Sequence, residues 1–315
     1  MRICLVTPTP PARSHGNSVT AQRWAGILRA LGHDVEVVQE HRGQAADVLV
    51  ALHARRSAQS VRRFRGGRHG PCVVIALTGT DLYPALTDAD RPVLELADRL
   101  VVLQPLAVEQ LPADLRARAR VIYQSAPPAS PQPPAAPERF DAVVLAHLRP
   151  VKDPLLAARA ARRLPAGSPV LVRHAGAAMD DDLGALARRE HDGNPHYEWL
   201  GELSRSEARA LLLGSRMLVV TSRHEGGANV VSEALAGAVP VLGTRIPGTV
   251  GILGEDYPGY FPVGDADALA GLLTRAARDP QWYARLRQRC AALRHLVLPE
   301  AERDSWRRLI AEIVS

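Results

Sequence analysis

The sequence predicts an α/β protein made of two doubly wound domains, each a parallel sheet covered by helices on both faces. Two observations carry this prediction. Short strands that are apolar throughout alternate with amphipathic helical stretches, which is typical of a sheet with two buried faces. The chain also has 315 residues, and because single cores stop growing at about 250–300 residues, two domains of roughly 150 residues are expected.

The first part of the chain supplies the elements of one domain. The apolar strand candidates are "RICLVT", "DVEVVQ", "DVLVAL", "CVVIAL", "RLVVLQ" and "RVIYQ". Helical stretches between them are "SVTAQRWAGILRALG", which ends at Gly32, and residues 54–66 and 105–118. This alternation predicts a parallel sheet over residues 1–125.

A proline-dense segment, "SAPPASPQPPAAPERF", follows the first set of strands. Because such a composition continues neither a helix nor a sheet, we interpret residues 126–139 as a stiff linker. The pattern then restarts and predicts a second domain over residues 140–299. Its strands are "DAVVLAHL", "PVLVRHAG", "HYEWLG", "RMLVVTS" and "AVPVLGT", and its helices are residues 153–163, 180–191, 204–213 and 229–237.

The tail, "PEAERDSWRRLIAEIV", predicts an amphipathic helix over residues 300–313. Trp306, Leu309, Ile310 and Ile313 lie on one face of it, and an apolar face of this size has to be buried against another part of the protein.

Charge and composition restrict the classes of partner. The net charge of +6 suggests anionic partners, with nucleotides and phosphates as candidates. Only 4% of the residues are aromatic, so side chains on which bases could stack are scarce, and small molecules are expected rather than nucleic acid. A basic nucleic-acid-binding module is the alternative from another class. The sequence gives no indication of an oligomeric state.

Cysteine usage and hydropathy bear on the compartment. Cys4, Cys72 and Cys290 are scattered and form no CxxC pair, which suggests reduced thiols and a cytoplasmic protein. No apolar run approaches the roughly 20 residues of a membrane span, so no stable membrane association is expected.

Residues 221–244, "TSRHEGGANVVSEALAGAVPVLGT", contain the most informative pattern. A strand ends near Ser222, and a turn with Gly226 and Gly227 leads into a helix that begins near Asn229, a good N-cap residue. Glycines before a helix start leave backbone N–H groups uncovered at the positive end of the helix dipole. The turn therefore predicts a site for an anion.

Two glutamates flank this helix start. Glu225 lies in the turn and Glu233 lies a little over one turn into the helix, so both can face one ligand that lies across the helix start. Each glutamate taken alone is also consistent with a solvated surface residue.

Lys152 is the one lysine among the 39 Lys and Arg residues of the chain. It lies in "HLRPVKDPLL", three residues after Arg149 and behind a predicted strand. A coding bias toward arginine is one explanation for its rarity. The other is that this position requires a compact point charge on a flexible stem, which a planar guanidinium does not replace.

These motifs resemble those of the retaining GT-B glycosyltransferases. Glu225, seven residues and then Glu233 match the E-x7-E signature, and "LRPVKDP" is similar to the "GR…KG" element. The resemblance implies that Arg149 and Lys152 hold the nucleotide-sugar pyrophosphate and that Glu225, the third catalytic candidate, contacts the transferred sugar. It also implies that Glu233 binds the ribose hydroxyls of the donor. The further donor-binding candidates are Gly226, Gly227, Ala228, Asn229 and His174.

The same resemblance implies the GT-B fold, in which two Rossmann-like domains face each other across a cleft. Ligands of open α/β sheets lie beyond the carboxyl ends of the strands, so the cleft between those ends is the expected site. The final helix of such proteins crosses back onto the first domain. The first domain would then comprise residues 1–125 plus the tail, 300–315.

Several phrases of the sequence look more specifically like the selenosugar synthases of selenoneine biosynthesis. They are "GNSVTAQRWAGILRALGH", "DVLVALHARRSAQSV", "ALTGTDLY", "LADRLVVLQPLA" and "ARVIYQSA". This resemblance implies transfer from a UDP-sugar, UDP-N-acetylglucosamine above all, to selenophosphate, with a 1-seleno-sugar as product and no cofactor beyond the two substrates. A UDP-sugar-dependent transferase to a hydroxyl or thiol is the alternative within the class. A dinucleotide-dependent enzyme is disfavoured, because neither first strand–helix turn carries G-x-G-x-x-G.

The first domain offers acceptor-binding candidates at strand ends and helix starts. They are Gly16, Asn17, His53, Arg55, Arg56, Thr80 and Asp81. An acceptor that is already ionised needs such donors but no general base, whereas a sugar hydroxyl needs a base. Arginines at positions such as Arg55 and Arg56 are more often solvated charges on a helix face, and His53 is equally consistent with a packing residue at the strand end. Asp81, beside Gly-Thr at a strand end, is expected to have few structural duties.

Three aspartate clusters fit the D-x-D pattern of metal-dependent transferases. They lie at residues 88–90, at 180–182, and at Asp265 and Asp267. The second and third open predicted helices, where aspartates cap N–H groups and favour the helix dipole, so we predict no divalent metal requirement. His224, beside Glu225, is a further possible ligand contact.

Overall fold

The structure is a computed structural model that describes residues 1–8, 16–66, 72–130 and 138–314. Contacts divide the chain into two compact units. Unit 1 comprises Met1–Gln124, Glu225–Asn229 and Pro299–Ser315, and unit 2 comprises Ser125–His224 and Val230–Leu298. The assignment of Glu225–Asn229 to unit 1 differs from the division expected from the sequence, and its cause lies in the close packing of this turn described below.

Unit 1 is built on a parallel sheet with the strand order β2-β1-β3-β4-β5-β6. Its strands are β1 (Arg2–Val6), β2 (Asp34–Val38), β3 (Val48–Leu52), β4 (Cys72–Leu77), β5 (Arg99–Val102) and β6 (Ala119–Val121). Its helices are α1 (Gly16–Ala30), α2 (Ala54–Gly66), α3 (Arg91–Leu94), α4 (Leu106–Glu109), the 3₁₀ helix η1 (Ala113–Arg118) and α12 (Pro299–Val314). The central strands β3 and β4 are almost fully buried, as continuous apolar runs in a covered parallel sheet should be.

The prediction of a single helix over residues 105–118 is wrong. The chain forms the short helix α4, then passes through Leu111 and Pro112 before η1 begins. Pro112 has φ −49° and ψ 138°, an extended conformation. A proline lacks the N–H that an interior helical position donates, so the helix is interrupted there.

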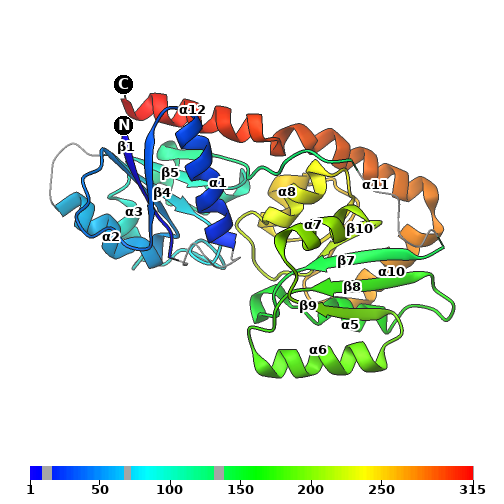
Figure 1. The fold of residues 1–315 in the computed structure, drawn as a ribbon. Coiled ribbons are helices and arrows are strands. Elements are labelled where there is room, and N and C mark those ends of the chain that lie inside the picture. Colours follow the sequence, from blue (N-terminus) through cyan, green and yellow to red (C-terminus); the bar gives the residue numbers. More distant parts are fainter. Residues whose placement is uncertain (9–15, 67–71, 131–137, 315) are drawn as a thin grey trace. The chain divides into compact units, whose positions relative to one another are not determined.

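The tail packs on the first domain, as expected for this fold. Figure 1 shows α12 running beside α1 at the chain ends of unit 1. Trp306 is completely buried and meets Trp24 edge to face, with the ring centroids 4.8 Å apart. Leu309 and Ile310 join the same apolar cluster. The apolar face that the sequence places on this helix is therefore the face that is buried.

Unit 2 contains a second parallel sheet, with the strand order β12-β11-β10-β7-β8-β9. Its strands are β7 (Phe140–Leu145), β8 (Val170–Ala175), β9 (Tyr197–Gly201), β10 (Met217–Val220), β11 (Val241–Thr244) and β12 (Tyr260–Phe261). Its helices are η2 (Pro150–Lys152), α5 (Leu156–Ala161), α6 (Asp181–Gly193), α7 (Arg205–Leu213), α8 (Asn229–Ala236, whose first residue belongs to unit 1), α9 (Pro247–Leu253), α10 (Ala266–Arg278), α11 (Pro280–Leu293) and η3 (Arg294–Val297). The predicted GT-B architecture of two parallel-sheet domains and a C-terminal helix is confirmed.

The segment interpreted as a linker is only partly described. Residues 131–137 of it lie outside the described residues. The N–H of Ala126 donates to the carbonyl of Val297 at 3.0 Å, and Arg209 donates to the carbonyl of Pro127 at 2.8 Å. The start of the segment is therefore bound to unit 2. Among the described helices, none combines the length and apolarity that crossing a bilayer requires.

Candidate active site

The loop after β7 carries Arg149 and Lys152, and residues after β10 hold it by hydrogen bonds to its backbone carbonyls. The carbonyl of Lys152 accepts from the hydroxyl of Thr221 at 2.7 Å, and the carbonyl of Val151 accepts from the N–H of Arg223 at 2.9 Å. Strand β10, which precedes Thr221, pairs directly with β7. The two loops are thus joined at the carboxyl edge of the sheet, where its order reverses and where ligands of such sheets bind.

The two predicted cations differ in exposure. The side chain of Arg149 is exposed, and within the described parts of the chain its guanidinium makes no hydrogen bond or ion pair. Lys152 is half-buried at the end of η2. Both side chains can be replaced without removing the backbone hydrogen bonds that shape the loop.

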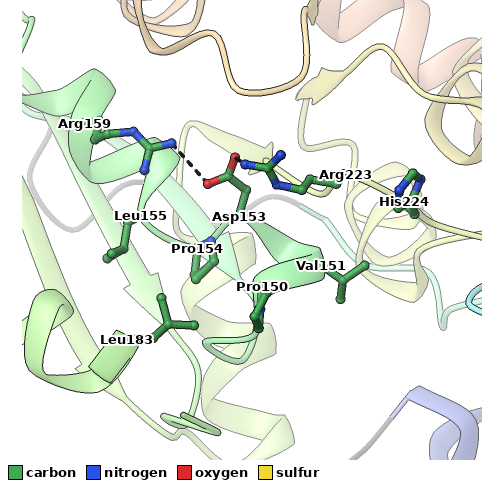
Figure 2. A pocket seen from close by; sticks show the side chains of 9 residues that line it. All are labelled: Pro150, Val151, Asp153, Pro154, Leu155, Arg159, Leu183, Arg223 and His224. Atoms are coloured by element: carbon green, nitrogen blue, oxygen red, sulfur yellow. Dashed lines mark hydrogen bonds and ion pairs between the residues drawn. The ribbon is translucent and has the colours of Figure 1, made fainter. Parts of the chain in front are cut away.

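Asp153 closes this loop and was not predicted as a site residue. Its backbone is left-handed, with φ 39° and ψ 58°, a conformation that Asp tolerates better than most residues. Its buried carboxylate accepts from Arg159 at 3.1 Å and from Arg223 at 3.0 Å, as Figure 2 shows. A buried carboxylate needs such partners, so the two guanidiniums stabilise the turn that follows Lys152. The sequence signal was an aspartate directly after the single lysine.

A cavity of about 440 Å³ opens beside this turn, within unit 2 (Figure 2). Its apolar wall consists of Pro150, Val151, Pro154, Leu155 and Leu183, and its polar side consists of Asp153, Arg159, Arg223 and His224. The lining is mostly apolar, and the two guanidiniums on its polar side are already paired with Asp153. His224, which the sequence offered as a ligand contact, thus lines the same cavity as residues of the Lys152 loop.

His174, a predicted donor contact, lies in the core instead. It is completely buried, with Nε2 at 2.8 Å from the carbonyl oxygen of Ala146 and Nδ1 at 2.9 Å from the hydroxyl of Tyr197. A carbonyl can only accept, so Nε2 carries the proton. Burial lowers the pKa of the ring to about 4. The neutral imidazole therefore supports the segment that leads from β7 toward Arg149, and both of its nitrogens are already engaged.

The turn with the two glycines packs against the loops of unit 1. A Cβ on Gly226 would lie 2.6 Å from the carbonyl carbon and oxygen of Thr78, and one on Gly227 would lie 2.6 Å from Cβ of Leu103. Such distances leave room for glycine alone. This close approach explains why Glu225–Asn229 belongs to unit 1. The two glycines therefore allow the backbone of Thr78 and the side chain of Leu103 to approach this turn closely. Anion binding by the same turn stays a prediction from the sequence.

The remaining members of the motif divide between the two units. Ala228 is buried, and Glu225 and Asn229 are half-buried in unit 1. Asn229 accepts on Oδ1 from Arg23 at 3.0 Å, a contact outside its predicted role at the helix start. Glu233 is half-buried on α8 in unit 2.

Asp81 has structural duties that the sequence did not reveal. It is completely buried, and its carboxylate accepts from the N–H groups of Thr78, Gly79 and Ala54 at 3.0, 2.8 and 2.9 Å. The carboxylate thus holds the loop after β4 and caps the start of α2. This use corrects the expectation that a carboxylate at this strand end has little to do structurally.

His53 is engaged next to Asp81. It is buried, with Nε2 3.0 Å from the hydroxyl of Thr80, itself an exposed residue. Burial lowers the pKa of the ring, and the nearby Asp81 carboxylate opposes that effect. The packing interpretation left open for His53 is therefore the one that the structure favours.

The two arginines of α2 differ from each other. Arg55 donates to the Asp90 carboxylate at 2.6 and 2.8 Å, and these bonds hold the pKa of Asp90 at about 2. Arg56 is exposed, and none of the described residues accepts from its guanidinium. Gly16 is exposed and Asn17 half-buried at the start of α1. The predicted acceptor set thus lies on one edge of one sheet, with Asp81, His53 and Arg55 occupied there.

The aspartate clusters serve the helices and loops around them. Asp180 accepts from the N–H of Leu183 at the start of α6, and Asp265 accepts from the N–H of Ala268 at the start of α10, at 3.0 and 2.8 Å. Asp90 binds Arg55 and the N–H of Thr87. The part of the chain that the structure describes contains no group of three His, Cys, Asp or Glu side chains placed to hold a metal ion.

Comparison with known proteins places this geometry in context. Residues 128–292, about half of the chain, match the model of the family described as "Glycosyl transferases group 1". A comparison of the sequence with curated proteins finds no match.

Solved structures share the fold at low sequence identity. Sucrose-phosphate synthase from Thermosynechococcus elongatus is 16% identical with a TM-score of 0.78, and the match covers 99% of each chain. Anabaena Alr3699/HepE in complex with UDP-glucose is 15% identical with a TM-score of 0.75, over 99% of this chain and 100% of that one. The pneumococcal O-GlcNAc transferase GtfA in complex with UDP and GlcNAc is 14% identical with a TM-score of 0.65, over 85% and 57%.

Proposed function

Because the chain belongs to the glycosyl transferases of group 1, we propose that it transfers a sugar from a UDP-sugar, with Arg149 and Lys152 at the donor pyrophosphate. The observation that carries this proposal is the loop after β7. It is fixed by backbone hydrogen bonds and by Asp153, and it presents an exposed guanidinium together with the single lysine at the carboxyl edge of the sheet. The choice of UDP is supported by HepE and GtfA, whose structures contain UDP or UDP-glucose.

The chemistry of the step explains why two cations are needed. When the bond between C1 of the sugar and the pyrophosphate oxygen breaks, both bonding electrons leave with UDP, and negative charge grows on the pyrophosphate. Arg149 can grip two oxygens with its planar fork, and Lys152 can turn its ammonium toward the developing charge. Groups that are preorganised for such charge contribute roughly 3 kcal/mol each to the barrier reduction.

The two glutamates have separate roles in this proposal. Glu233, on α8 of unit 2, accepts from the ribose hydroxyls of the donor. Glu225, in the turn held by Gly226 and Gly227, contacts the transferred sugar. Loss of Glu233 is therefore expected to weaken UDP binding, whereas loss of Glu225 is expected to reduce turnover more than UDP affinity.

We further propose selenophosphate as the acceptor, on the resemblance of the sequence phrases to selenosugar synthases. Selenium attacks C1, the Se–C1 bond forms as the C1–O bond breaks, and UDP leaves. Loss of the phosphoryl group to water then yields the 1-seleno-sugar and phosphate. An ionised acceptor needs no general base. An acceptor of this kind is consistent with unit 1, because Asp81 and His53, the residues that could act as a base there, already make hydrogen bonds within their own loops.

Product analysis tests both halves of the proposal. Wild-type protein is incubated with UDP-N-acetylglucosamine in separate reactions, each of which contains one acceptor: selenophosphate, thiophosphate, phosphate, a thiol or water alone. The products are identified by mass spectrometry. The proposal predicts that the reaction with selenophosphate yields UDP and a 1-seleno-sugar, and that it forms more product than the reaction with any other acceptor. Preferred transfer to a hydroxyl or thiol would replace the acceptor assignment, and the absence of UDP release from any UDP-sugar would overturn the donor assignment.

A further inference from the structure

A buried ion pair joins the C-terminal helix to α1 inside unit 1. The Glu302 side chain on α12 has no exposed surface, and it accepts from Nε of Arg23 at 2.8 Å and from Nε1 of Trp24 at 2.7 Å. Burying a carboxylate is unfavourable unless it is paired and hydrogen-bonded, and here it is both. The position of the Arg23 guanidinium is therefore set by a residue near the far end of the sequence.

The other side of the Arg23 guanidinium reaches the turn with the two glycines. Its Nη1 donates to Oδ1 of Asn229 at 3.0 Å. The amide nitrogen of Asn229 lies 3.4 Å from the hydroxyl of Thr20, which also accepts from Gln124 at 2.8 Å. A chain of polar contacts thus runs from α12 through α1 to the last residue of the turn.

Two close packing contacts also hold this turn, and Glu225 precedes both. Gly226 lies against the backbone of Thr78 and Gly79, and Gly227 lies against Leu103. Asn229 is the anchor at the other end of the turn. The Nη2 atom of Arg23 is buried without a hydrogen-bond partner among the described residues, so the orientation of this guanidinium depends on Glu302 and Asn229.

We propose that Arg23 is a positioning residue for the turn Glu225–Asn229 and that Glu302, on the C-terminal helix, orients Arg23 for this purpose. The inference rests on the proposed function, since it assigns to the pair the task of holding Glu225 where the transferred sugar is contacted. Through this pair the tail contributes to turnover as well as to the core of unit 1. A misplacement of about 1 Å, caused far from the reacting atoms, can slow an enzyme about a hundredfold.

The test compares Arg23→Met and Glu302→Gln with a matched control on the same helix. Glu312 also lies on α12 and pairs with Arg99 and Arg120 in unit 1 at 3.0 and 2.9 Å. Arg99 and Arg120 lie on or beside strands β5 and β6 and not in the turn, so Glu312→Gln removes a carboxylate from the same helix at a place away from the turn. Arg23→Met preserves the length of a partly exposed side chain, which keeps the test usable if a change at the buried Glu302 hinders folding.

The first measurement is hydrogen exchange of the peptide that spans residues 222–232, in protein without substrates. Arg23→Met and Glu302→Gln should speed exchange of the turn amides about tenfold, because these amides exchange through local opening of the turn. Glu312→Gln should leave them unchanged. Unaltered exchange in Arg23→Met overturns the proposal.

The second measurement is steady-state turnover of the UDP-sugar. Arg23→Met should lower kcat about tenfold or more while KM for the donor changes less than about threefold, because the turn contacts the transferred sugar and the nucleotide is bound elsewhere. Faster exchange with an unchanged kcat overturns the positioning role. If the wild type releases no UDP at all, the proposed function fails, and the exchange measurement alone decides whether the ion pair holds the turn.

Discussion

The polar residues at the strand ends of unit 1 hold their own loops, whereas the cations after β7 in unit 2 lie on a loop that other groups hold. Asp81 and His53 each bond to neighbouring loop atoms, and Arg55 is paired with Asp90. In unit 2, the backbone of Lys152 is bonded to Thr221. Both units place polar side chains at the carboxyl edge of a parallel sheet, yet the arrangement around them differs.

The difference shows what a polar residue at a strand end can and cannot indicate. A loop whose N–H groups require acceptors will use a nearby carboxylate for that purpose, whatever its sequence context suggests. A residue can serve a ligand when the loop is satisfied without it. By this criterion Arg149 is a functional candidate and Asp81 is a structural residue.

The largest effect is expected from the cations of unit 2. Lys152→Ala and Arg149→Ala should each lower kcat by about a hundredfold or more, because each removes a group worth roughly 3 kcal/mol of transition-state stabilisation. The melting temperature of Arg149→Ala should not change, since backbone atoms hold the loop. Lys152→Arg should also be slow, because the guanidinium fork has a different geometry. Arg189→Ala, an exposed position on α6, serves as the control, and near-normal turnover in either cation variant would remove the leaving-group role.

The opposite pattern is expected from the carboxylate of unit 1. Asp81→Ala leaves the N–H groups of Thr78, Gly79 and Ala54 without their acceptor. Buried donors that lose a partner cost about 1–3 kcal/mol each, so urea unfolding should show a loss of about 3 kcal/mol or more. UDP affinity should stay within about threefold of wild type, because Arg149, Lys152 and Glu233, the residues proposed to hold the pyrophosphate and the ribose, lie in unit 2. A variant of full stability would show that Asp81 is not the structural residue described here.

A smaller effect is expected from the pH dependence of stability. Burial holds the pKa of His174 at about 4, below its ordinary value of 6.5. As the pH falls below 6.5, His174 binds a proton in the unfolded chain but not in the folded protein. Its contribution to the free energy of unfolding is therefore fully present above pH 6.5 and declines toward pH 4. Between pH 7 and pH 5 this group should remove about 2 kcal/mol of unfolding free energy. His174→Gln, compared with wild type in urea at both pH values, should show a flatter dependence, and an equal slope would contradict the assignment.

No effect is expected from a chelator. The aspartates Asp180 and Asp265 cap helices in unit 2, and the proposed leaving-group stabilisation uses Arg149 and Lys152. Turnover of the UDP-sugar in excess EDTA should equal turnover without it. Loss of activity that Mg²⁺ or Mn²⁺ restores would show that a divalent ion assists the leaving group.

The sequence predicts local patterns well and long-range approaches poorly. The alternation of apolar strands and amphipathic helices predicted both sheets, and the stripe with Trp306 predicted which face of α12 is buried. The duties of Asp81 escaped prediction because Ala54, one of its donors, is distant in sequence. The membership of Gly226 in unit 1 escaped it because the contact with Thr78 depends on how the fold brings two loops together.

Calorimetric titration with UDP is the measurement that tests the central claim most directly, because it requires neither the sugar nor the acceptor. Wild-type protein should bind UDP saturably. The double variant Arg149→Ala with Lys152→Ala should bind it about a hundredfold more weakly or not at all, since two charge-assisted contacts of about 1.5–3 kcal/mol each are lost. Asp81→Ala should retain wild-type affinity. UDP binding that is equally tight in the double variant, or absent in the wild type, would contradict the assignment of Arg149 and Lys152 to the donor pyrophosphate.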